Sequence, residues 1–296
     1  MKILTRIILA ELIGLAVNAQ AQYDLTTLND PLGANGTFAE GISGNNVVGY
    51  YYDSNNNRHG FVYNGSSYAT LDVPGALGTF AYGVSGNSIV GNYEDSSGGF
   101  HAFLFNGTSY SYPNVPGSFG YTTASGISGN NIVGAYQNGN LNGYLFDGST
   151  YTVLNVPGST YTEASGISGN NILGLYGYNN KDYSFLYEGT SYTTLGYPGA
   201  TATYALGISG QDIVGYYTDG GGTHDFLYDG SSYTALDLPS IVQGISDGEM
   251  VGYYFDGGIY HGFLATPSTV PEPSTLALSA ISGLSFLLLN RRRLFN

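Results

Sequence analysis

The sequence predicts an all-β fold, a six-bladed β-propeller over residues 22–266 that is closed by its N-terminal strand. Three observations support this prediction: a pattern that occurs six times, short strand-like runs between turn signals, and an unmatched strand-like run before the first repeat. Four strands fit each unit, and four strands in a repeat of this size are typical of a propeller blade.

The repeat begins with Gly-[Ile/Val]-Ser, and the copies are 42, 43, 40, 41 and 37 residues apart. These copies begin at Gly41, Gly83, Gly126, Gly166, Gly207 and Gly244. In each copy an apolar pair and a glycine follow, then two further β-branched and aromatic runs separated by an Asn-Gly or Asp-Gly type of turn. Such runs predict strands in antiparallel hairpins.

The two ends of the repeat region indicate how the ring closes. The sixth unit stops after its third strand at Phe263-Leu264, whereas residues 23–31 match the fourth strand of the first unit at residues 68–74. We therefore expect the N-terminal strand to complete the sixth blade, which removes two open sheet edges. An open solenoid would need capping repeats instead.

Composition excludes several classes of function. The chain has no Cys, which excludes disulfides, thiol nucleophiles and Cys-ligated metals. Residues 22–269 contain only two basic side chains, Arg58 and Lys181, against nineteen acidic ones. Such a surface repels nucleic acid and anionic lipid, so we expect no nucleic-acid partner.

The N-terminus has the features of a secretory signal peptide, residues 1–21. Lys2 and Arg6 precede a short apolar run, and small residues at Ala19 and Ala21 form a cleavage site. An N-terminal membrane anchor is the alternative, although Glu11 interrupts the apolar run.

The C-terminal segment, residues 267–296, combines three elements. Pro271-Glu272-Pro273 precedes an apolar run at 276–289, and Arg291, Arg292 and Arg293 follow. The run is of marginal length for a transmembrane helix, and the arginines would remain cytoplasmic. A plain tail anchor is the alternative interpretation.

This order of elements closely resembles the PEP-CTERM sorting signal of Gram-negative bacteria that make exopolysaccharide. The resemblance covers about 25 residues and rests on Pro271, Glu272, Pro273 and the three arginines. It implies an exosortase-type enzyme as partner, transient insertion of a C-terminal hydrophobic helix into the inner membrane, and delivery to the cell surface or extracellular matrix.

The units also resemble the HAF repeat of exported bacterial proteins. His101-Ala102-Phe103 matches the motif that gives the repeat its name, and His59, His224 and His261 occupy the same phase. This chain departs from the family in having Ser where Asn is usual, as at Ser43. The resemblance supports the architecture and implies no catalytic residue.

No catalytic motif, cofactor or metal site is predicted. The four in-phase histidines and the Asp- and Asn-rich connections are interpreted as packing and turn residues, because no closing Glu or standard metal-ligand spacing accompanies them. A glycosidase would need two carboxylates converging in a cleft, and no acidic residue is marked out by its sequence position.

One constellation suggests binding. The connection that enters each first strand carries aromatic residues, which we expect to surround the central channel as a channel rim. These residues are Phe38, Phe80, Tyr121, Tyr161 and Tyr204. Aromatic faces beside amide and carboxylate groups suit sugar rings. The alternative is that these side chains pack between blades.

The sequence therefore predicts an exported, non-enzymatic surface or matrix protein that binds exopolysaccharide or a protein partner. An extracellular carbohydrate-active hydrolase or lyase is the alternative, and a spacer without a ligand is a third possibility. A convergent pair of carboxylates at the channel would favour the enzyme, whereas exposed aromatic residues without such a pair would favour binding.

Overall fold

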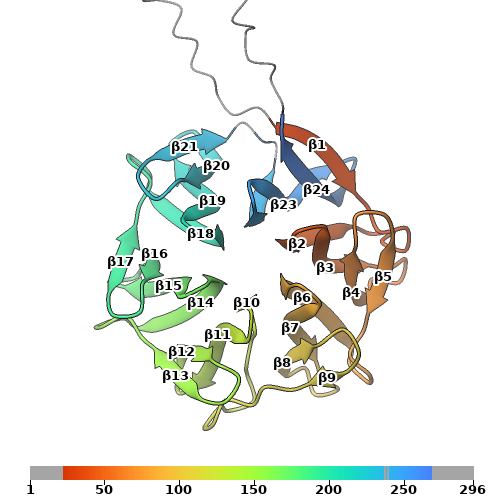
Figure 1. Cartoon of the computed structure of the whole chain (residues 1–296), viewed down its shortest axis with the longest axis horizontal. Helices are drawn as coiled ribbons and strands as arrows, with labels where there is room; N and C mark the ends of the chain where they lie inside the picture. The colour runs from red at the N-terminus through yellow and green to blue at the C-terminus, as the bar shows by residue number, and fades with distance from the viewer. Residues whose placement is uncertain (1–22, 237, 239, 269–296) are drawn as a thin grey trace, which may run out of the picture. The chain divides into compact units, whose positions relative to one another are not determined.

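The structure, a computed structural model, describes residues 23–236, 238 and 240–268. Leu25–Thr266 form one compact unit. Within the described residues all regular secondary structure is β-strand. The unit is an all-β propeller whose sheets surround a central channel (Figure 1).

The first three repeat units supply twelve strands. In the first unit these are β2 (Thr37–Ser43), β3 (Asn46–Tyr52), β4 (Arg58–Tyr63) and β5 (Tyr68–Leu71). In the second they are β6 (Gly78–Ser85), β7 (Ser88–Glu94), β8 (Phe100–Phe105) and β9 (Tyr110–Ser111). In the third they are β10 (Gly126–Ser128), β11 (Asn131–Asn138), β12 (Asn140–Phe146) and β13 (Tyr151–Leu154).

The last three units supply eleven strands, and β1 (Tyr23–Leu28) is added to them. The fourth unit has β14 (Tyr161–Ser168), β15 (Asn171–Tyr178), β16 (Lys181–Tyr187) and β17 (Tyr192–Leu195). The fifth has β18 (Ala202–Ser209), β19 (Asp212–Asp219), β20 (Gly222–Tyr228) and β21 (Tyr233–Leu236). The sixth has β22 (Ile241–Ser246), β23 (Glu249–Asp256) and β24 (Ile259–Pro267).

The prediction that the N-terminal strand completes the last unit is confirmed. The sixth sheet has the order β1-β24-β23-β22, so strands from opposite ends of the repeat region are hydrogen-bonded neighbours. Side chains reinforce this contact: the Thr27 and Tyr254 hydroxyls lie 3.0 Å apart, and His261 Nδ1 lies 3.1 Å from Asn29 Oδ1.

The prediction of six separate blades needs correction. Units three to six form four separate four-stranded sheets, but units one and two share one eight-stranded sheet. A single parallel bridge between Arg58 and Gly78 joins β4 to β6. The Arg58 guanidinium draws the two strands together, because it forms an ion pair with Glu94 at 2.8 Å and lies over the Phe80 ring at 5.5 Å.

Strand β9 has only two residues, and the sequence explains why. Pro113 occupies the place that Leu71 and Leu154 take in their units, at the end of the outermost strand. Because proline has no backbone N–H and restricts the residue before it, the strand ends early.

The repeated Ser of Gly-[Ile/Val]-Ser links neighbouring units around the channel. In five cases its hydroxyl oxygen accepts a hydrogen bond from a backbone N–H in the turn of the next unit. The pairs are Gly129–Ser85 (3.1 Å), Gly169–Ser128 (3.0 Å), Gly210–Ser168 (2.9 Å), Asp247–Ser209 (3.4 Å) and Gly44–Ser246 (3.4 Å). The last pair joins the sixth unit to the first.

The glycine that follows each apolar pair is required by a bulge in the innermost strand. In β6 the pairing with β7 skips from Ala81 to Gly83, and this irregularity brings the Phe80 carbonyl oxygen against Gly91. A Cβ at Gly91 would overlap that oxygen, and the equivalent glycines Gly49 and Gly215 meet the same obstacle. A side chain at this position would therefore force the two strands apart.

We therefore expect Gly91→Ala to destabilise the fold by more than ~3 kcal/mol, since backbone and not a flexible side chain must move. That loss corresponds to a fall of about 6–12 °C in melting temperature for a domain of this size. Gly196→Ala is the matched control, because a Cβ there meets nothing within 4 Å. Equal melting temperatures for the two variants, measured by circular dichroism, would contradict the steric explanation.

Candidate functional site

The strand order gives the compact unit two different faces. Each innermost strand runs from the face that carries the second-to-third and fourth-to-next-first connections, which we call the loop face. It ends at the face that carries the tight Ser-Gly-Asn and Asn-Gly turns, which we call the turn face. The innermost strands β2, β6, β10, β14, β18 and β22 surround the channel between these faces (Figure 1).

The channel contains a cavity of about 330 Å³, which we call the chamber. All six innermost strands line it, and each unit contributes the residue directly before Gly-[Ile/Val]-Ser. These residues are Glu40, Tyr82, Ser125, Ser165, Leu206 and Gln243. In five units this residue lies in a β-bulge of the innermost strand, where the hydrogen-bond pairing with the next strand skips one position. The bulge turns the side chain of this residue into the channel.

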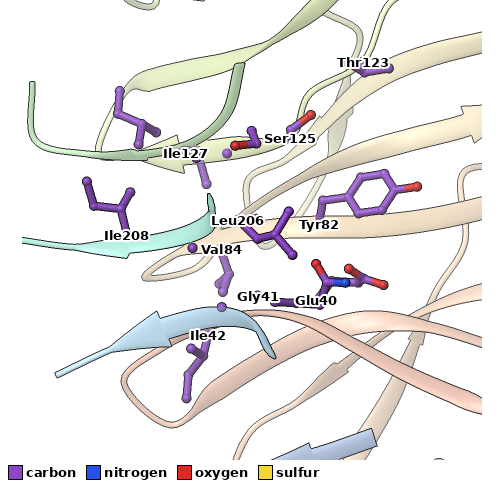
Figure 2. A pocket seen from close by; sticks show the side chains of 18 of the residues that line it. Glu40, Gly41, Ile42, Tyr82, Val84, Thr123, Ser125, Ile127, Leu206 and Ile208 are labelled. Carbon is purple, nitrogen blue, oxygen red and sulfur yellow. The ribbon is translucent and has the colours of Figure 1, made fainter. Parts of the chain in front are cut away.

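The chamber is apolar towards the turn face and polar towards the loop face. The Ile or Val of each repeat forms an aliphatic belt made by Ile42, Val84, Ile127, Ile167, Ile208 and Ile245. Figure 2 shows members of this belt on one side, and Glu40, Tyr82 and Thr123 on the other. The polar part also contains Asn92, Tyr121 and Glu163.

Two carboxyl groups, Glu40 and Glu163, lie in the polar part of the chamber. Protein atoms surround the Glu40 carboxyl, and burial raises its pKa to about 8. Burial also raises the pKa of Glu163. Both carboxyls are partly accessible, from the chamber.

Tyrosines surround Glu40. Tyr82 lines the chamber, and its pKa is raised first by burial and then by the Glu40 charge. Burial, with the Glu40 charge second, also raises the pKa of Tyr50 and brings that of Tyr253 to about 12. The Tyr253 hydroxyl accepts a hydrogen bond of 3.3 Å from Gln243 Nε2. The walls near Glu40 are thus aromatic and carry hydroxyl groups.

The predicted channel rim is not formed as expected. Phe38 and Phe80 are only 8% and 7% exposed, so they pack between neighbouring units and do not offer their faces to a ligand. Phe38 stacks on Tyr50 at 4.8 Å between ring centroids and contacts Tyr253 of the sixth unit at 5.0 Å. The alternation of side chains along a strand puts both phenylalanines in the interface between units.

The three tyrosines of the predicted rim are partly exposed, and they lie in different surroundings. Tyr121 lines the chamber. The Tyr161 hydroxyl donates a hydrogen bond of 2.6 Å to Asp182, and Tyr204 stacks on Tyr216 at 4.8 Å. Tyr121 is therefore the one predicted rim residue that the described structure brings to the cavity.

An exposed aromatic patch on the loop face was not predicted from the sequence. Phe255 and Tyr260, on either side of the β23–β24 connection, are 63% and 40% exposed, and their ring centroids lie 5.0 Å apart. Tyr260 also packs against Gly36, in the connection that leads into β2. We call Phe255 and Tyr260 the aromatic patch. Both residues lie in the sixth repeat, which follows the common pattern least closely. The pattern that the repeats share therefore does not single them out.

Amide and carboxylate groups lie next to the aromatic patch. Asn35, the neighbour of Gly36, donates through Nδ2 to the Asp53 carbonyl and to Asn56 Oδ1, both at 2.9 Å. Asp53 Oδ1 accepts from the backbone N–H groups of Asn55 and Asn57. These bonds hold the polar loop in place beside the exposed rings.

The four in-phase histidines are occupied by local partners. His59, His101 and His224 lie 2.7–3.6 Å from loop aspartates, and His261 lies between Asn29 and the Asp256 carbonyl. Each also packs on a tyrosine of the adjacent strand, as His101 does on Tyr93. No cluster of three or more potential metal ligands occurs within the part of the chain that the structure describes.

The segments predicted for export and sorting lie outside the described residues. They comprise residues 1–21 with Ala19 and Ala21, and the tail with Pro271, Glu272, Pro273 and the three arginines. In residues 23–236, 238 and 240–268 there is no helix with the length and apolar character needed to cross a membrane.

Comparison with known proteins gives the fold class. No protein-family model matches the chain, and neither does any curated protein. Among solved structures, the β-propeller domain of the Trilobed protease from Pyrococcus furiosus aligns with a TM-score of 0.51 at 11% identity, over 79% of this chain and 84% of that one. At this identity the similarity establishes the β-propeller fold alone.

Two further propellers align more weakly. The fucose-recognising lectin of the fungus Aleuria aurantia has a TM-score of 0.45 at 13% identity, over 82% of this chain and 91% of that one. The sialidase of Trypanosoma rangeli has a TM-score of 0.48 at 10% identity, over 87% of this chain and 57% of that one.

The pKa of Glu40 predicts how stability depends on pH. Between its ordinary value of 4.5 and about 8, the folded chain keeps a proton that the unfolded chain has lost. Stability therefore falls as pH rises through this range and levels off above it. In Glu40→Gln this contribution is absent, so we expect the variant to gain stability relative to the native chain up to pH 8.

Denaturant unfolding at pH 5, 6.5, 8 and 9 measures this difference. Asp225 is also buried, with its pKa raised to about 7. It therefore lowers the stability of the native chain and of Glu40→Gln by the same amount as pH rises. Glu188→Gln, on an exposed hairpin turn, is the control and should follow the native chain. Parallel curves for Glu40→Gln and the native chain would show that the Glu40 carboxyl is hydrated in the folded state.

Proposed function

We propose that this chain is an exported, non-enzymatic propeller that binds extracellular polysaccharide at its loop face. The observation that carries the proposal is the aromatic patch of Phe255 and Tyr260. Two large rings are exposed there beside a polar loop held by side-chain hydrogen bonds. Sugar rings have apolar faces and hydroxyl edges, so they match such a surface in both respects.

The charge of the chain supports a neutral or cationic polysaccharide. Two basic residues oppose nineteen acidic ones in residues 22–269, which disfavours a strongly anionic polymer. The loops beside the patch offer amide groups and an aspartate, which donate to and accept from sugar hydroxyls. A protein partner at the same patch is the competing occupant.

Export and surface display complete the proposal. The basic start, apolar run and Ala19/Ala21 site support cleavage of a signal peptide. Pro271-Glu272-Pro273, the following apolar run and Arg291–Arg293 support recognition by an exosortase-type enzyme at the inner membrane. The propeller would then reach the cell surface or the extracellular matrix as a rigid binding unit.

Binding of the chain to the exopolysaccharide of its host tests this proposal. We expect Phe255→Ala and Tyr260→Ala each to weaken binding about tenfold, which corresponds to ~1.4 kcal/mol. Phe119→Ala is the matched control, because Phe119 is 71% exposed and lies outside the patch. Biolayer interferometry on immobilised polysaccharide gives the dissociation constants.

Two outcomes of that experiment would count against the proposal. Absence of saturable binding by the native chain would favour a protein partner or a spacer role. An equal loss of polysaccharide affinity in all three variants would show that exposed aromatic residues bind the polymer without forming a defined site.

A carbohydrate-active hydrolase or lyase is the second candidate, and one observation favours it. Glu40 and Glu163 share the chamber, and the raised pKa of Glu40, about 8, suits a general acid. Against this, Glu40 of β2 and Glu163 of β14 come from opposite sides of the channel, whereas glycosidases need two carboxyls about 5–10 Å apart beside the scissile bond (Figure 1).

Reducing-end release from the same polysaccharide tests the enzyme. If the chain is a hydrolase that uses these groups, Glu40→Gln and Glu163→Gln should each lower turnover at least 100-fold, while Glu188→Gln keeps full activity. We expect no release above background from the native chain. Turnover that disappears in both chamber variants would replace the binding proposal with the enzyme.

A further inference from the structure

The Glu40 carboxyl lacks a partner in the chamber. Within the described residues it has no hydrogen bond and no ion pair, although protein atoms surround it and burial raises its pKa. Its accessible surface faces the cavity. A buried carboxyl is normally hydrogen-bonded or paired, so this group is available to a ligand.

The described part of the chain supplies no cation to the chamber. Arg58 and Lys181 are its two basic residues apart from histidines. Arg58 pairs with Glu94, and Lys181 begins β16 after the second-to-third connection of its unit. The histidines are bound to their own loops. A positive group that enters the chamber would therefore meet two carboxyls and no competing charge.

Aromatic rings surround the same space. Tyr82 and Tyr121 line the chamber, and Tyr50 and Tyr253 lie close enough to Glu40 to interact with its charge. A ring face attracts a cation through its quadrupole, most strongly where water is excluded. The combination of tyrosine walls with two carboxyls differs from a metal site, which needs several converging oxygen or nitrogen ligands.

We propose that the chamber binds a small organic ammonium ion, with Glu40 as the counter-ion and Tyr82 and Tyr121 as aromatic walls. The volume of about 330 Å³ is at the lower end for small-molecule sites. The aliphatic belt of Ile42, Val84 and their equivalents supplies the apolar contact that alkyl groups on the ammonium nitrogen require. This site is separate from the aromatic patch and does not depend on polysaccharide binding.

Ammonium binding at this site should depend on pH. Below pH 8 the Glu40 carboxyl holds a proton, which it must release before it can act as a counter-ion. The groups that face it are Tyr50 of β3, Tyr82 of β6 and Tyr253 of β23, with Glu163 of β14 in the same cavity. Burial raises the pKa of Tyr50, Tyr82 and Tyr253, which therefore remain neutral.

Isothermal titration of the full chain with choline tests the proposal, and 3,3-dimethyl-1-butanol is the neutral probe of the same shape. We expect one saturable site for choline and at least tenfold weaker binding of the alcohol. Choline affinity should rise by up to about tenfold per pH unit between pH 6 and 8 and then level off. Titration at pH 7 in buffers of different ionisation enthalpy should show that a proton is released on binding.

Variants separate the chamber from general surface charge. Glu40→Gln should abolish choline binding and proton release, while the exposed control Glu188→Gln should bind like the native chain in 0.5 M NaCl. Tyr82→Leu should weaken binding at least tenfold, and Tyr82→Phe, which keeps the ring, should retain it. Glu163→Gln should retain proton release, because Glu40 is the titrating group.

Four results would overturn the proposal. They are no choline binding by the native chain at millimolar concentration, equal binding of the neutral alcohol, full binding by Glu40→Gln, and equal loss in Glu188→Gln. If Glu40→Gln does not fold, as judged by circular dichroism, the comparison of Tyr82→Leu with Tyr82→Phe decides. Polysaccharide binding should be unchanged in Tyr82→Leu, which weakens choline binding, so the failure of one site is distinguishable from the failure of the other.

Discussion

The structure depends on the close approach of the innermost strands around the channel. A Cβ at Gly83 would lie 3.1 Å from the Gly126 Cα, one at Gly207 would lie 2.8 Å from the Gly244 Cα, and one at Gly244 would lie 2.9 Å from the Glu40 carbonyl oxygen. Backbone therefore packs on backbone from unit to unit, including from the sixth unit to the first. Only glycine permits this spacing at every junction, which explains why it begins all six repeats.

The same constraint creates the chamber. Because glycine holds the strands close, the strand must bulge to continue its pairing, and the skipped residue turns towards the channel. That residue makes no ladder contact of its own, so its identity is free to vary. The fold thus fixes six positions around one cavity without fixing their chemistry, and this chain places Glu40, Tyr82 and Gln243 at three of them.

The architecture was predictable from the sequence because repeated residues specify it. The Gly-[Ile/Val]-Ser turns, the Asn-Gly hairpins and the unmatched run at 23–31 each identify a structural position, and the strands follow them. The joined sheet of units one and two was not predicted, since it depends on one arginine, Arg58, that has no counterpart in the other repeats. A residue that occurs in one repeat only, as Arg58 does, is not part of the pattern that the repeats share.

The candidate site was harder to predict, for a related physical reason. Phe38 and Phe80 stand in a repeated position, and repeated positions in a propeller serve contacts between units, so both rings are buried. The polar side chains that face the chamber stand where the repeats disagree, as Glu163 does at the position that Phe38 and Phe80 take in their units, so the shared pattern does not mark them. Because Glu40 and Glu163 come from units one and four and lie at different positions relative to Gly-[Ile/Val]-Ser, the symmetric scaffold encloses an asymmetric set of charges. The side chains, and not the circular arrangement of the six units, would therefore orient a ligand that binds there. Single substitutions at the variable positions should change ligand specificity without disturbing the fold.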